Sequence, residues 1–130
     1  MTINQLLDGR DALIRLTKKH FKSYKTARSL VLLRKAVESE IGIFLELEQE
    51  AIKNYAAKDE KGNPVFLADG RLQLKDEESK ERFEKSMLEA RESEVEGIQP
   101  INLREEDFVS AEDFPTPSDM ILLEPIVVFE

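Results

Sequence analysis

The single imidazole of this sequence is the first candidate for a catalytic side chain. His20 is the only histidine among 130 residues, its neighbours include Lys18, Lys19 and Lys22, and the chain has no cysteine. Neighbouring cations disfavour protonation of an imidazole, and the absence of cysteine excludes thiolate nucleophiles and thiolate-ligated zinc. We therefore predict a surface or connector role for His20 and no catalytic residue.

Carboxylates four residues apart on a helix could in principle grip a divalent cation. Glu46 with Glu50, and Glu77 with Glu81, have this spacing. No histidine accompanies either pair, and the chain contains no HExxH, no EF-hand and no glycine-rich phosphate loop. A solvated acidic face is the favoured interpretation, so we predict no metal ion, no cofactor and no enzymatic activity.

Charge is distributed unevenly along this acidic protein. The net charge is −8, yet residues 1–35 have a net charge of +7 and residues 36–130 one of −15. Cations with aromatic rings between them could contact phosphates and stack on a base. Pairing with the acidic segments 76–96 or 105–113, of this chain or of another copy, is favoured over nucleic acid. The candidate interaction residues here are Arg10, Arg15, Lys18, Lys19, Lys22, Tyr24, Lys25 and Arg28.

Apolar residues at spacings of three and four predict two helices in the first half of the chain. A capping box at Thr2 opens a helix over 3–18, which Gly9 weakens by about 1 kcal/mol relative to Ala. After an extended connector at 20–22, we expect a long helix over 24–57. Extra apolar residues widen the stripe around its middle, so other helices or a second subunit should cover it.

The segment 65–74 predicts a β-hairpin. Asp69-Gly70 favours a two-residue type I′ loop, which would place Leu67 opposite Leu72. Strand alternation would then bring four apolar side chains to one face of the hairpin, namely Val65, Leu67, Leu72 and Leu74. This chain or another copy must cover that face.

The last third of the chain predicts one more long helix and a tail. We expect a helix over 77–95 that runs back along the long helix as a helical hairpin. Residues 98–130 should form a mostly extended tail with a short helix at 117–123. An apolar chain end is usually tied down by pairing, within the chain or across an interface. The end residues therefore join the candidate interaction surface: Ile126, Val127, Val128 and Phe129.

Together these elements predict a mainly α (α+β) protein. Its fold would be a long helical hairpin with an inserted β-hairpin, a short N-terminal helix and short C-terminal helix and strand segments. The length fits a single domain over residues 1–130. No run approaches the roughly 20 apolar residues of a membrane span, and no secretory signal is recognisable. We therefore expect a cytosolic protein that contacts no membrane.

Five short segments, spread over nearly the whole chain, carry a resemblance to a known family. They are Ser23–Ala27, Lys58–Pro64, Glu94–Glu96, Ile101–Leu103 and Ile121–Pro125. In these segments and their order, the chain resembles a family of small uncharacterised proteins of tailed bacteriophages and prophages. The resemblance implies a phage origin, with a place in the host cell cytoplasm or in the virion, and implies no particular chemistry.

These observations leave three functions open. The favoured one is a non-enzymatic phage accessory protein, a structural or assembly component that works through protein–protein contacts. It would self-associate as a homo-oligomer, or dock on a larger particle, through the long helix and the C-terminal apolar segment. The alternative is a phage interaction protein that binds a host factor or a ligand to counter defence. An enzyme without a recognisable catalytic constellation is the least favoured.

Overall fold

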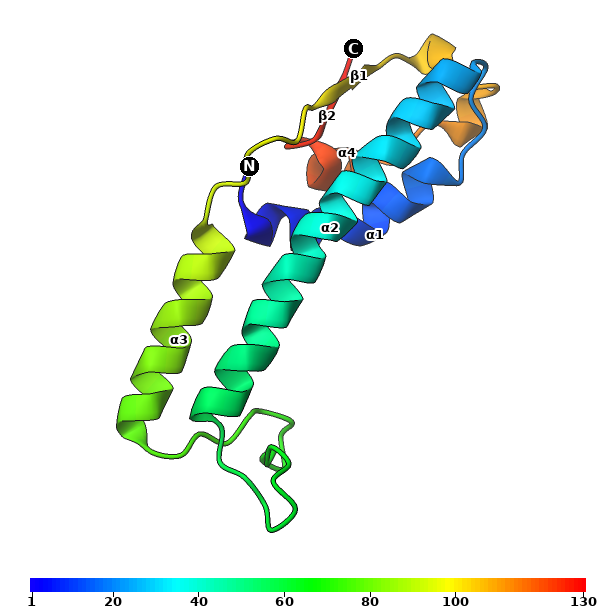
Figure 1. Ribbon diagram of the computed structural model, residues 1–130. Coiled ribbons are helices and arrows are strands. Elements are labelled where there is room, and N and C mark those ends of the chain that lie inside the picture. Colours follow the sequence, from blue (N-terminus) through cyan, green and yellow to red (C-terminus); the bar gives the residue numbers. More distant parts are fainter. The chain divides into compact units, whose positions relative to one another are not determined.

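The computed structural model describes residues 1–130, and its elements follow the predicted order (Figure 1). They are helices α1 (Ile3–Thr17), α2 (Tyr24–Tyr55), α3 (Glu77–Glu92) and α4 (Pro117–Leu123), strands β1 (Ile101–Leu103) and β2 (Val127–Phe129), and 3-10 turns at Glu105–Asp107 and Ala111–Asp113. The mainly α fold with a small β component confirms the predicted fold class. None of the helices combines the length and the apolar character that crossing a bilayer requires.

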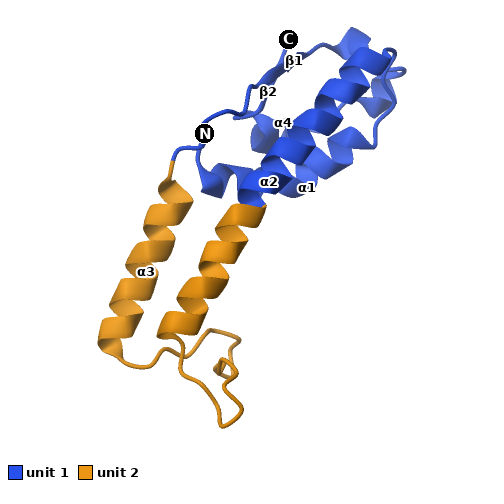
Figure 2. Ribbon diagram, viewed as in Figure 1, with its two compact units in different colours: residues 1–41, 94–130 blue, residues 42–93 orange.

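The chain divides into two compact units (Figure 2). Residues 1–41 and 94–130 form unit 1, residues 42–93 form unit 2, and α2 is one continuous helix with a part in each. The single domain that the sequence suggests stays a prediction.

In unit 1, α1 begins at the capping box that the sequence predicts. The Thr2 hydroxyl accepts a hydrogen bond from the Gln5 N–H at 3.2 Å, and the Gln5 side chain accepts one from the Thr2 N–H at 2.9 Å. These reciprocal bonds satisfy two N–H groups that a helix start leaves free. One side of α1 is apolar and buried, through Ile3, Leu6, Ala12, Leu13 and Leu16.

A glycine lets α1 and α4 approach each other closely. A Cβ built on Gly9 would lie 2.8 Å from the carbonyl oxygen of Leu122, a backbone atom near the end of α4. Contact at this distance leaves no room for a side chain, and a backbone atom cannot turn aside as a flexible side chain can. The residue that weakens the isolated helix therefore makes the packing of the two helices possible.

The C-terminal segment belongs to the core of unit 1. The two strands pair in parallel, with Ile101 opposite Val127 and Leu103 opposite Phe129. The short helix at 117–123 is confirmed to the residue, but the prediction of a tail is wrong. Polar residues separate the apolar ones at irregular intervals, so periodicity cannot reveal that they converge. The buried residues of this segment include Ile98, Leu103, Phe108, Leu123, Ile126 and Val127.

Unit 2 is a helical hairpin of the second part of α2 with α3, as predicted. The Asp76 side chain caps the first turn of α3. Near the other end of α3, the Arg91 guanidinium lies 5.9 Å from the centroid of the Phe44 ring and 3.8 Å from a carboxylate oxygen of Glu48. A cation–π contact and an ion pair thus join the two helices at the same side chain.

The β-hairpin at 65–74 is present in a shorter form with a different loop. The Gly70 N–H donates to the Leu67 carbonyl at 2.9 Å, and the Leu67 N–H donates to the Arg71 carbonyl at 2.7 Å. These bonds close a three-residue loop that ends in a glycine with φ of +86°. The predicted type I′ loop is wrong, because it needs a positive φ at Asp69 too and only glycines have one here.

The longer loop shifts the pairing by one residue. Phe66, instead of Leu67, lies opposite Leu72, so the predicted single face of Val65, Leu67, Leu72 and Leu74 is also wrong. Both arms of the hairpin bond to the chain just after α2: the Val65 N–H donates to the Ala57 carbonyl at 3.0 Å, and the Ala57 N–H donates to the Gln73 carbonyl at 2.9 Å. This pairing explains why α2 ends at Tyr55, two residues before its predicted end.

Candidate interaction surface

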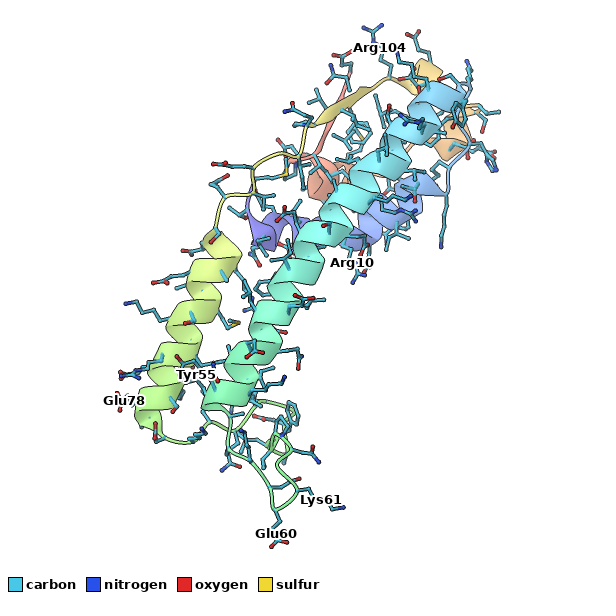
Figure 3. The ribbon with its side chains drawn as sticks, viewed as in Figure 1. Arg10, Tyr55, Glu60, Lys61, Glu78 and Arg104 are labelled. Atoms are coloured by element: carbon cyan, nitrogen blue, oxygen red, sulfur yellow. The ribbon has the colours of Figure 1, made fainter.

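The arginines on α1 are held by carboxylates of unit 1. Arg10, which Figure 3 labels, donates two hydrogen bonds to Glu38 of α2, at 3.0 and 2.9 Å. Arg15 donates two to Asp119 of α4, at 3.1 and 2.6 Å. The hydrogen bond from Arg15 holds the pKa of Asp119 below its ordinary value. These bidentate pairs join α1 to its neighbours, so neither arginine is free to bind a phosphate.

The connector between α1 and α2 lies against the acidic segment 105–113, the second of its two predicted partners. The Val109 N–H donates to the His20 carbonyl, and the Lys22 N–H donates to the Asp107 carbonyl, each at 2.9 Å. The His20 ring contacts Asp113 at 3.2 Å while remaining 78% exposed, which confirms its predicted surface and connector role. Desolvation raises the pKa of Asp113, but the bond and the charge of His20 outweigh it and lower that pKa.

Five predicted cations remain without a carboxylate partner. They lie in the connector and on the first turns of α2, beside a Tyr24 side chain that is 81% exposed. Ser23 caps this helix, accepting a hydrogen bond from the Thr26 N–H at 3.1 Å. The unpaired cations are Lys18, Lys19, Lys22, Lys25 and Arg28, of which Lys19 is half-buried and the others are exposed.

The apolar chain end is divided between core and surface. Ile126 and Val127 are buried, whereas Val128 is exposed and Phe129 is half-buried. The Phe129 ring packs edge-to-face on Phe114, with 5.9 Å between the ring centroids. Of the two pairings that the sequence allows for this end, the structure has the one within the chain. Only Val128 among the four is open to an outside partner.

The predicted interaction residues do not include an exposed apolar surface on α2, although the sequence predicts a widened apolar stripe around the middle of this helix. Leu32, Ile43 and Leu47 are 47%, 52% and 57% exposed, so the chain leaves about half of each side chain uncovered. The opposite side of the helix is buried in unit 1, through Leu30, Leu33, Val37 and Ile41. The expected wide cover around the middle of this helix is therefore absent within the chain. The available signal was the run of apolar residues outside the regular stripe.

Cavities in both units are open to solvent. In unit 1, a cavity of about 650 Å³ is lined by Lys22, by residues between Arg104 and Ala111, and by Glu130 at the chain end. In unit 2, a groove of about 540 Å³ lies between the β-hairpin and α3, with Leu72 and Phe83 in its apolar lining and charged residues beside them. No three His, Asp or Glu side chains converge as a metal site requires.

No known protein family matches the chain, no curated protein is similar to it, and no solved structure matches it. Any link to phage proteins therefore depends on the five short segments of the sequence alone.

Proposed function

We propose that this protein is a non-enzymatic bacteriophage accessory protein, a structural or assembly component that acts through protein–protein contacts. The observation that carries the proposal is the exposed apolar surface on α2. Scattered apolar side chains are ordinary on the surface of a protein, but Leu32, Ile43 and Leu47 recur along one helix. Covering such a surface with a partner is favourable, because it removes apolar side chains from water.

The charged side chains support a structural role. Long-range pairs such as Arg10–Glu38 and Arg15–Asp119 connect different elements of unit 1. In the same unit, Arg104 donates to Glu130 at 2.9 Å and so ties the start of the first 3-10 turn to the chain end. These side chains are engaged in fixing the fold instead of converging on a substrate. The phage origin, and a place in the host cytoplasm or the virion, come from the resemblance.

Solution mass tests the proposal. We expect light scattering across a concentration series to give a mass above that of the 14.9 kDa chain, falling on dilution. Mass spectrometry of the purified protein would identify any particle component that remains bound. A mass of one chain at every concentration, with no bound protein, would contradict the proposal.

A second candidate function, binding of a host factor or an anionic ligand to counter defence, is favoured by the unpaired cations beside Tyr24. Lysines without carboxylate partners can contact phosphates, and an exposed ring can stack on a base. Fluorescence anisotropy with a labelled single-stranded oligonucleotide tests it, with binding that weakens steeply as salt rises. The K22E/K25E variant should then lose binding, and a variant that binds as well as wild type would exclude this surface.

A further inference from the structure

One face of α2 carries a symmetric row of exposed side chains. Lys25, Leu32, Ile43 and Glu50 stand at spacings of seven, eleven and seven residues. A helix has about 3.6 residues per turn, so these spacings are close to two, three and two turns, and the four side chains lie nearly in line. All four are exposed. We call them the α2 row, and at about 1.5 Å per residue it is roughly 38 Å long.

Charge changes sign along this row and its immediate flanks. The half nearer the helix start carries Lys25, Arg28 and Lys35, and the other half carries Glu46 and Glu50, all exposed. Only Glu50 has a partner within the chain, Lys53 at 3.9 Å, and with 66% and 70% exposure that pair is weak. The remaining charges along the row are open to a partner of opposite sign.

We propose that the α2 row binds the α2 row of a second copy in antiparallel orientation. A two-fold axis midway between Leu32 and Ile43 brings each Leu32 opposite Ile43 of the other copy. The same axis brings each Lys25 opposite Glu50 of the other copy, so apolar and charged positions are both self-complementary. A parallel pair would set like charges against each other at both ends, which opposes that arrangement.

The middle of the row suits close packing of two helices. Ala36 and Ser39 flank the proposed axis, and small side chains let helices approach to about 8–10 Å between axes. Leu32 and Ile43, 47% and 52% exposed in a single copy, would become buried. This inference rests on the proposed function, because it specifies the surface and the partner for the self-association proposed there.

Charge reversal tests the surface. The K25E/R28E variant carries acid at both ends of the row, and the E46K/E50K variant carries base at both ends. Each alone should raise the dissociation constant of its own dimer by about tenfold or more, because like charges face each other. An equimolar mixture of the two variants should recover the wild-type affinity as a heterodimer. Sedimentation equilibrium with one labelled variant measures both quantities.

A matched control changes charge equally outside the row. Lys58 and Lys61 lie on the exposed loop after α2, whose tip Figure 3 marks at Glu60 and Lys61. K58E/K61E should dimerise as wild type does. A dimer that both row variants leave unchanged would overturn the proposed surface and leave the proposed function standing. A wild-type chain that is a monomer at all concentrations would contradict both.

Cross-linking tests the orientation, and the chain offers a clean background because it has no cysteine. K25C and E50C, when mixed with a short bifunctional thiol reagent, should form a covalent dimer of one variant with the other. Each variant alone should cross-link at least about tenfold less, since an antiparallel pair holds identical positions far apart. K25C that cross-links to itself as readily as to E50C would overturn the antiparallel arrangement.

Discussion

The two units differ in how much apolar core they contain. All ten of the largest fully buried side chains belong to unit 1, among them Phe108, Leu123 and Leu13. Unit 2 buries four apolar residues, and its larger ones, Phe44 and Met87, keep 4% and 7% of their surface exposed. Since burial of apolar surface is the main stabilising contribution to folding, most of the stability should reside in unit 1.

Local interactions partly compensate in unit 2. Asp76 accepts a hydrogen bond from the Ser79 N–H at 2.7 Å, and this bond lowers the pKa of Asp76. Arg82 pairs with Glu78 one turn away at 2.6 Å. Such contacts are worth a few tenths of a kcal/mol to about 1 kcal/mol each, less than one buried apolar side chain. The contrast teaches that unit 2 is held by helix propensity and capping, and unit 1 by packing.

The largest expected effect comes from truncating one core side chain in each unit. Phe108 packs against Phe21 and Phe114, with ring centroids 4.9 and 5.3 Å away. F108A should lower the free energy of unfolding by about 3–5 kcal/mol, and M87A in unit 2 by only about 2 kcal/mol, the low end for its type. Urea unfolding followed by circular dichroism measures both. If M87A costs as much as F108A, the proposed difference between the units is wrong.

Substitution of two separate glycines offers a sharper test, because the two changes in the free energy of unfolding should have opposite signs. In G9A the new methyl group would meet the Leu122 carbonyl 2.8 Å away, so we expect a loss of about 1–3 kcal/mol. Gly42 lies inside α2, and a Cβ added there would have nothing within 4 Å, so G42A should gain about 0.5–1 kcal/mol from helix propensity. Thermal unfolding of the two variants measures both effects. Two changes of the same sign would contradict this interpretation of the α1–α4 contact.

Capping chemistry explains why some helix boundaries could be predicted from the sequence. Thr2 with Gln5, and Thr116 with Pro117, mark their helix starts through hydrogen bonds and backbone angles that involve only near neighbours. The hairpin loop could not be settled in this way. Asp69-Gly70 suits the last two positions of a three-residue loop as well as both positions of a type I′ loop, so local preference did not fix the register.

The candidate site was predictable only in part, because the contacts of its side chains depend on partners that are distant in the sequence. Arg10 and Arg15 look as free as the neighbouring lysines, yet their carboxylate partners lie 28 and 104 residues away in the sequence. The exposure of apolar side chains on α2 was unpredictable for the same reason. Leu32 stands in an apolar run with Leu30 and Leu33, which are buried, and only the packing of other elements decides which of them stays outside.

The smallest expected effect concerns the ion pair that joins α1 to α4 in unit 1. The hydrogen bond from Arg15 lowers the pKa of Asp119 below the 3.8 of an unperturbed carboxyl. The stabilisation from this ion pair is therefore complete above that unperturbed pKa. It is lost as the pH falls through the lower pKa that Asp119 has in the folded protein. D119N should cost about 1 kcal/mol near neutral pH, since Arg15 is 52% exposed, and progressively less in acid.

Urea unfolding of wild type and D119N, from neutral pH into the acid range, measures this difference. Asp8 gives a matched control, because it is an exposed aspartate on α1, the helix that carries Arg15, and forms no ion pair, so D8N should leave stability unchanged throughout. A cost for D119N that stays constant into acid would mean that its charge plays no part in holding α4. The packing of Gly9 against Leu122 would then hold the two helices without help from the ion pair, a stronger form of the contrast between a packed unit 1 and a capped unit 2.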